Sequence, residues 1–123
     1  MDSLVARIDH LQIAAPEGCE SAARDFYGSI LGMKEIEKPA ALRARGGCWF
    51  QCGSQQVHIG VERNSHPARK AHPAFAVFRL DEMREMLKSR RVPIVEDDDL
   101  PGTRRFYAED PWGNRIEFVE TPA

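Results

Sequence analysis

The chain has 123 residues, 42% of them hydrophobic and 29% charged, which is typical of one globular domain with a core of its own. The formal net charge is −2 and no basic stripe is interleaved with aromatic residues, which argues against nucleic-acid binding. The opening MDSLVARIDHLQIAAPEG lacks a basic segment followed by a long apolar stretch, so we expect no signal peptide, no membrane partner and a cytoplasmic location.

The first part of the chain, about residues 5–62, predicts the order strand, helix and three strands. RIDHLQIAA is typical of a strand, and ESAARDFYGSILG predicts a helix over about 20–32 with Gly32 at its end. Strands are expected over about 34–38, 48–52 and 56–61. If the GS between the last two is a two-residue turn, the pairs are Cys52 with Gln55, Phe50 with Val57, and Trp49 with His58.

The three cysteines do not suggest a disulfide framework. Cys48 and Cys52 lie about 13 Å apart along an extended strand, which is too far for a disulfide. We interpret them and Cys19 as small buried apolar residues. A thiol nucleophile is the alternative, but no base lies near any of them in the sequence.

The same pattern restarts after a polar linker at about 63–71. Over about 72–120 the chain gives HPAFAVFRL as a strand, a helix over about 81–90, and strands near VPIVED, RRFYAED and RIEFVE. His72 follows His10 by 62 residues (72 − 10), and Glu117 follows His58 by 59 (117 − 58). A nearly constant offset indicates an internal duplication, so the expected fold class is α+β with two βαβββ modules.

Side-chain alternation places four candidate ligands on equivalent strand faces. His10, His58, His72 and Glu117 each alternate with apolar residues that favour the core. For each histidine alone, an exposed or hydrogen-bonded structural role is the more common interpretation. The matched set instead favours a divalent metal ion such as Zn, Ni, Mn or Fe(II), and the small neighbours Gly60, Ala74 and Ala76 suggest room on this face.

The motifs IDHLQIAAP, ARDFYGSILGM and FYAEDPWGNRIEFVE, in this order and with the duplication, resemble the vicinal oxygen chelate superfamily. That superfamily includes glyoxalase I, fosfomycin-resistance thiol transferases, extradiol dioxygenases and bleomycin-binding proteins. The resemblance covers essentially the whole chain, taken as one domain over 1–123. It implies a cleft with the metal on the concave sheet face, usually completed by a homodimer.

The resemblance carries His10, His72 and Glu117 onto metal ligands, with His58 at a position where glyoxalase I has a glutamate. This set is closer to fosfomycin-type transferases and dioxygenases, and the role of His58 as a fourth ligand or a substrate-facing group stays open. Glu117 is also the candidate general base, because a carboxylate that leaves the metal transiently can accept a proton.

Three further side chains are expected to line the cleft and bind substrate. Trp49 would be a wall for an apolar or planar molecule, with burial in the core as the alternative, and Gln12 would orient the substrate. Arg104 and Arg105 are adjacent in a strand, so one of them faces the cleft and could hold a carboxylate or phosphate; we select Arg104, against the alternative of a solvated charge.

The sequence thus predicts a metal-dependent, glyoxalase-like enzyme (a lyase, isomerase or thiol transferase) acting on a small molecule with oxygens on neighbouring atoms. One alternative is a protein that binds a small molecule or antibiotic without turnover, as bleomycin-resistance proteins do. Another is an extradiol-type dioxygenase.

Overall fold

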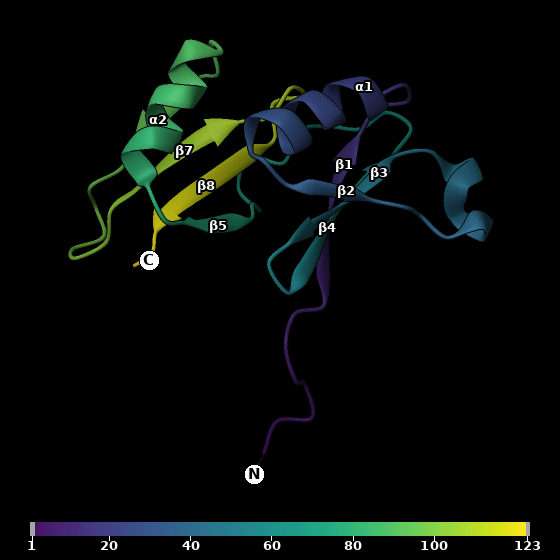
Figure 1. Ribbon diagram of the computed structural model, residues 1–123, viewed down its shortest axis with the longest axis horizontal. Coiled ribbons are helices and arrows are strands. Elements are labelled where there is room, and N and C mark those ends of the chain that lie inside the picture. Colours follow the sequence, from purple (N-terminus) through teal and green to yellow (C-terminus); the bar gives the residue numbers. More distant parts are fainter. Residues whose placement is uncertain (1, 123) are drawn as a thin grey trace.

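The computed structural model describes residues 2–122, which form two units of the same topology (Figure 1). The strand order is β1-β4-β3-β2 in the first sheet and β5-β8-β7-β6 in the second. In both sheets the first and last strands of the unit are parallel neighbours, and the other pairs are antiparallel. The expected α+β fold with two βαβββ modules is therefore confirmed.

Module one contains the strands β1 (His10–Ala15), β2 (Lys34–Ile36), β3 (Cys48–Cys52) and β4 (Gln55–Val61). Its helical segments are α1 (Glu20–Ala23), which continues as the π-helix Arg24–Ile30, and a 3₁₀ helix at Ala40–Arg45. Module two contains the strands β5 (Ala74–Val77), β6 (Ile94–Glu96), β7 (Arg105–Glu109) and β8 (Arg115–Glu120), with one helix, α2 (Leu80–Ser89).

The hairpin pairing expected from the GS turn is confirmed at each of its three pairs: Cys52 with Gln55, Phe50 with Val57, and Trp49 with His58. The core faces also follow the alternation. Phe50 and Phe118 are at most 1% exposed, and their strand neighbours Trp49 and Glu117 project to the opposite face.

The helical part of module one is less regular than the sequence suggested. The expected single helix is a short α-helix followed by a π-helix, in which the amide of Leu31 donates to the carbonyl of Phe26 at 2.9 Å. The 3₁₀ helix was not expected at all. It ends at Gly46 and Gly47, and Gly47 has to be glycine, because its φ is +81° and a Cβ there would lie 2.0 Å from the carbonyl oxygen of Ile59.

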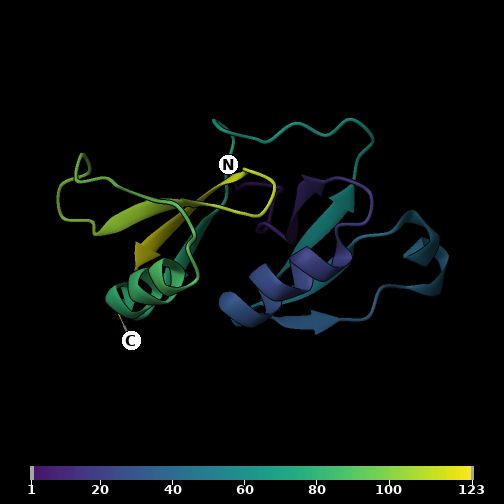
Figure 2. The same cartoon turned by 90° about the horizontal axis from the view of Figure 1, so that it is seen from above.

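Figure 2 shows α1 with its π-helix, and α2, on one side of the two sheets, while the segment connecting β4 to β5 crosses the other side. None of the helices in residues 2–122 has the length and apolar content needed to span a bilayer. The core residues that alternate with the candidate ligands point to the helix side, as Phe50 does towards Tyr27. The candidate ligands therefore lie on the sheet faces that no helix covers.

A buried hydrogen-bond network joins the modules at the turn between β7 and β8. The Tyr27 hydroxyl of module one donates to the Asp110 carboxylate at 2.8 Å, and the Asn114 side-chain amide donates to the same carboxylate at 2.9 Å and to the Ala14 carbonyl at 3.1 Å. Asp110 and Asn114 are 5% and 3% exposed. Burial raises the pKa of Tyr27 well above its ordinary value, and the adjacent Asp110 charge adds to this.

Candidate functional site

Three rings form a column on the helix-free face of module one. The rings of Trp49 and His58 are stacked with centroids 3.8 Å apart and an interplanar angle of 2°, and His10 stacks on His58 at 4.3 Å. The strand order explains this contact, because β4 lies between β1 and β3. His58 in the middle of the column is 6% exposed.

The two histidines of this column differ in their hydrogen bonds. His10 Nδ1 lies 3.0 Å from the Asp9 carboxylate, which can only accept, so Nδ1 carries the proton and Nε2 keeps its lone pair. His58 Nε2 lies 2.9 Å from Gln56 Oε1. Burial lowers the pKa of His58 and the neighbouring His10 lowers it further, which favours the neutral imidazole that metal ions require.

The corresponding face of module two carries a hydrogen-bonded histidine and carboxylate instead of a ring column. His72 Nε2 lies 2.9 Å from Glu117 Oε1, and the Arg105 guanidinium lies 3.3 Å from Glu117 Oε2. Glu117 is only 7% exposed, so these two contacts are the partners that make its burial tolerable. The carboxylate of Glu117 in this buried strand is thus compensated by a histidine and an arginine.

At Nδ1, His72 resembles His10. Its Nδ1 lies 2.8 Å from the backbone carbonyl of Lys70, and because a carbonyl can only accept, Nδ1 carries the proton. Its Nε2 either shares a proton with Glu117 or offers a lone pair to a ligand. In metalloproteins a ligating histidine commonly donates its other ring N–H to a carboxylate or backbone carbonyl, so the chemistry of both residues fits a divalent ion.

The four candidate ligands do not meet within one chain. His10 and His58 lie on the first sheet and His72 and Glu117 on the second. No three histidine, cysteine, aspartate or glutamate side chains within residues 2–122 form a group that could hold a metal ion. A cavity of about 440 Å³ separates β1 and β4 from β5, and His10 is the candidate ligand among its lining residues.

The selection of Arg104 as the substrate-facing arginine was wrong. Arg104 extends to the helix side, where it bonds Asp81 of α2 at 2.6 Å and pairs with Glu120. Arg105 faces the other way and contacts both Glu117 and, at 3.3 Å, Asp97. Adjacent residues in a strand point to opposite faces, and the sequence alone did not fix which of the two faced the helix.

Gln12 and Trp49 lie on the same sheet face as His58, but the room expected beside Gly60 is absent. Gly60 does not leave open space, because a Cβ at this position would lie 2.7 Å from the amide carbon of the Gln12 side chain. The glycine thus accommodates Gln12 within module one. In module two Ala74 and Ala76 are exposed, so the small residues leave that part of the face open.

Tyr107 is a site residue that the sequence analysis missed. It pairs with Glu117 across β7 and β8, just as Trp49 pairs with His58 across β3 and β4. Its ring meets His72 edge-on with centroids 5.5 Å apart. The signal was available, because extending the repeat from Trp49 to the strand RRFYAED places an aromatic residue beside the ligand in both modules. Asp97, which contacts Arg105, had no such signal.

Comparisons with known proteins were made for the whole chain. The family model described as the Glyoxalase/Bleomycin resistance protein/Dioxygenase superfamily matches residues 7–118. A search of curated proteins found no match.

Solved structures with the same fold include a glyoxalase family protein from Bacillus anthracis. It is 52% identical with a TM-score of 0.94, and the match covers 98% of this chain and 99% of that one. A lactoylglutathione lyase from Agrobacterium tumefaciens is 20% identical, with a TM-score of 0.75 and 96% of each chain covered. A glyoxalase/dioxygenase from Nostoc punctiforme is 22% identical, with a TM-score of 0.76 and coverage of 100% and 99%. The last two share the fold.

Proposed function

The chain belongs to the glyoxalase/bleomycin resistance protein/dioxygenase superfamily, and from that premise we propose that it is a divalent-metal-dependent enzyme acting on a small molecule with oxygens on neighbouring atoms. The observation that carries the proposal is the matched state of His10 and His72. Each is at the same position of its repeat, and each has Nδ1 bound to an acceptor, so that Nε2 would be the atom that binds the ion. In His72 this atom lies 2.9 Å from Glu117, which is itself a proposed ligand.

The ion would be held by His10, His58, His72 and Glu117, a set of imidazole and carboxylate donors suited to Zn, Ni, Mn or Fe(II). When bound, such an ion acts as a Lewis acid that stabilises negative charge developing on a substrate oxygen. Because the pairs lie on different sheets, we propose that the site is shared in a homodimer, with His10 and His58 of one protomer facing the equivalents of His72 and Glu117 on the other.

The chain's own groups would then bind and orient the substrate. Glu117 is the proposed general base, since its carboxylate lies within hydrogen-bond distance of His72 and Arg105 and could accept a proton from substrate. Arg105 fixes one carboxylate oxygen of Glu117. The rings of Trp49 and Tyr107 would be walls for the substrate on the two sheets, with Gln12 as an additional polar contact.

A complementation experiment tests the shared site. One variant carries His10→Ala and His58→Ala, and the other carries His72→Ala and Glu117→Ala. The wild type should hold about one divalent ion per chain by elemental analysis, and each variant alone none. In a purified heterodimer, the intact His72 and Glu117 of the first variant face the intact His10 and His58 of the second. One of the two sites is therefore complete, and the heterodimer should hold one ion.

The heterodimer also excludes the competing arrangement. If both modules of one chain build the site, each variant chain lacks half of it and the heterodimer holds no metal. Light scattering on the wild type must give a dimer, and a strict monomer with full metal content would contradict the shared site.

The second candidate function is small-molecule binding without turnover, and the separation of the two ligand pairs within one chain favours it. A metal content that stays substoichiometric after reconstitution would favour this second function. A metal-loaded protein should turn over at least one of a panel of hemithioacetals, thiol plus epoxide, and catechols. Silence across this panel would also favour a binding protein.

A further inference from the structure

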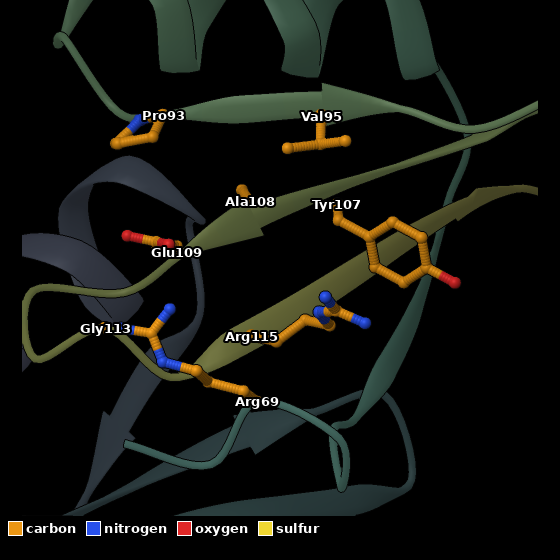
Figure 3. A pocket seen from close by; sticks show the side chains of 8 residues that line it. All are labelled: Arg69, Pro93, Val95, Tyr107, Ala108, Glu109, Gly113 and Arg115. Atoms are coloured by element: carbon orange, nitrogen blue, oxygen red, sulfur yellow. The ribbon is translucent and has the colours of Figure 1, made fainter. Parts of the chain in front are cut away.

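A small cavity with two arginines lies on the helix-free face of module two (Figure 3). Its lining residue Tyr107 pairs with Glu117 across β7 and β8. Its volume is about 110 Å³, against about 300–1,000 Å³ for pockets that hold a whole ligand. The cavity could therefore hold one group of a substrate and not all of it. It is lined by Arg69, Tyr107, Glu109, Arg115 and residues of β6 and the β7–β8 turn.

The Arg115 side chain is directed into this cavity without an ion-pair partner. Arg115 is directly opposite Glu109 across β7 and β8, yet within residues 2–122 it forms no salt bridge with that carboxylate or any other. Its guanidinium instead lies over the Tyr107 ring, 4.9 Å from the centroid. A guanidinium stacked in this way is held in place while its N–H donors remain available.

Arg69 belongs to the linker between the modules, but its backbone is fixed. The adjacent Ala68 amide donates to Asn114 Oδ1 at 2.8 Å, and the Ala68 carbonyl accepts from the Arg115 amide at 2.8 Å. These two bonds attach the linker to β8, so Arg69 and Arg115 are presented to the same cavity by a rigid segment. Figure 3 shows the two side chains starting close together, with the Arg69 guanidinium extending towards Gly113 and Glu109 and that of Arg115 towards Tyr107.

The charges of this face are unevenly balanced. Arg105 is compensated by Glu117 and Asp97, whereas Arg69 and Arg115 share the cavity with one carboxylate, Glu109. The position in module one that corresponds to Arg115 is the neutral Gln56, 59 residues earlier (115 − 56). The positive charge is thus specific to module two and is not a property of the repeat.

We propose that this cavity binds an oxyanion of the substrate, a carboxylate or a phosphate, through Arg115 and Arg69. Tyr107 links it to the reacting end, because the same ring contacts Arg115 and His72 and lies beside Glu117. The inference rests on the proposed function and narrows it: the substrate class is a small molecule with oxygens on neighbouring atoms at one end and an anionic group at the other.

The test is a titration of the full-length protein with inorganic phosphate and, separately, with acetate, followed by the NMR shifts of the Ala68, Tyr107 and Arg115 amides. Both the metal-depleted and the metal-loaded protein are used, so that binding to an ion is distinguished from binding to the cavity. Saturable binding should persist in about 0.15 M chloride, because paired arginines recognise planar or tetrahedral oxyanions through several hydrogen bonds.

Arg115→Ala and Arg69→Ala should each weaken binding by about tenfold or more, as expected for loss of a charged hydrogen-bonding group. Arg63→Ala is the matched control, since Arg63 is an exposed arginine in the same connecting segment that does not line the cavity, and it should leave binding unchanged. Preference for phosphate or for acetate identifies which oxyanion the substrate carries.

Two outcomes would overturn the inference: no saturable binding of either anion to the wild type, or equal loss of binding in Arg63→Ala and Arg115→Ala. The elemental analysis keeps the two proposals apart. Anion binding without metal uptake means that only the proposed function fails, and metal uptake without anion binding means that only this subsite fails.

Discussion

The two modules have the same backbone plan and different chemistry. In each module the first and last strands are parallel neighbours, and the residue two positions after the first histidine lies opposite the candidate ligand of the last strand. These pairs are Gln12 with His58 in module one and Ala74 with Glu117 in module two. Module one fills this face with stacked rings, and module two fills it with a histidine, a carboxylate and arginines.

The two copies of the repeat thus have equivalent strand positions but different side chains at those positions. His58 is desolvated between two rings, whereas Glu117 is buried against two partners that can both donate to it. A neutral imidazole and a carboxylate are both suitable donors for one divalent ion. In the proposed shared site each module would thus supply part of the ligand set, and this can be tested by substitutions in either module.

The largest effect is expected at the contact between the modules. Asp110→Ala removes the acceptor of Tyr27, Asn114 and two backbone amides in a buried turn, and should lower the free energy of unfolding by about 3 to 4 kcal/mol. Tyr27→Phe removes one of these bonds and should cost about 1 kcal/mol. Urea unfolding measures both.

The control for this prediction is Asp98→Ala, because Asp98 is exposed in the segment between β6 and β7 and should change stability by no more than about 0.5 kcal/mol. If Asp110→Ala were as mild as Asp98→Ala, the turn would not hold the modules together.

The next largest effect concerns the charged donor of module two. Glu117→Ala should weaken divalent-metal binding by more than about 100-fold, because it removes a ligand together with the hydrogen-bond partner of His72. Glu120→Gln is the matched control, since Glu120 is in the same strand but pairs with Arg104 on the helix side. Competition with a metal indicator gives both affinities, and equal losses in the two variants would remove Glu117 from the site.

A smaller effect separates the two roles left open for His58. If His58 is a ligand, His58→Ala should weaken metal affinity by an amount comparable to His10→Ala, about tenfold or more. If it faces substrate, the metal should stay and turnover alone should fall. We expect the first result, since burial favours the neutral imidazole of His58. Full metal occupancy with lost turnover would contradict it.

The smallest effect is a pH dependence confined to module one, which contains all three cysteines. Burial raises the pKa of Cys48 to about 11 from an ordinary value of 9.0, so the folded state holds this proton more tightly than the unfolded state. The resulting stability is complete below about pH 9 and is lost as the pH rises through about 11. The raised pKa of Tyr27 acts with the same sign.

Urea unfolding at pH 8 and pH 10.5 should therefore show a decrease on the order of 1 kcal/mol at the higher pH. Cys48→Ala should have a smaller decrease than the wild type, because it lacks one of the groups that titrate. An identical pH dependence in both proteins would mean that Cys48 makes no contribution.

Much of the site's position followed from the sequence. The offsets between His10 and His72 and between His58 and Glu117 were sufficient to find both modules, and the GS turn fixed the pairing of Trp49 with His58. These features depend on near neighbours along the chain: a strand alternates with period two, and a two-residue turn fixes the register of the strands it joins.

Only the tertiary structure decided which charged residues share a sheet face and which residues contact them. It placed Arg105 and Asp97 with Glu117, turned Arg104 towards α2, and attached the linker to β8 through Ala68. It also filled the space above Gly60 with Gln12 and placed a hydrogen-bond acceptor at Nδ1 of both His10 and His72. These outcomes depend on which segments distant in the chain pack together, and local periodicity carries no information about such long-range contacts.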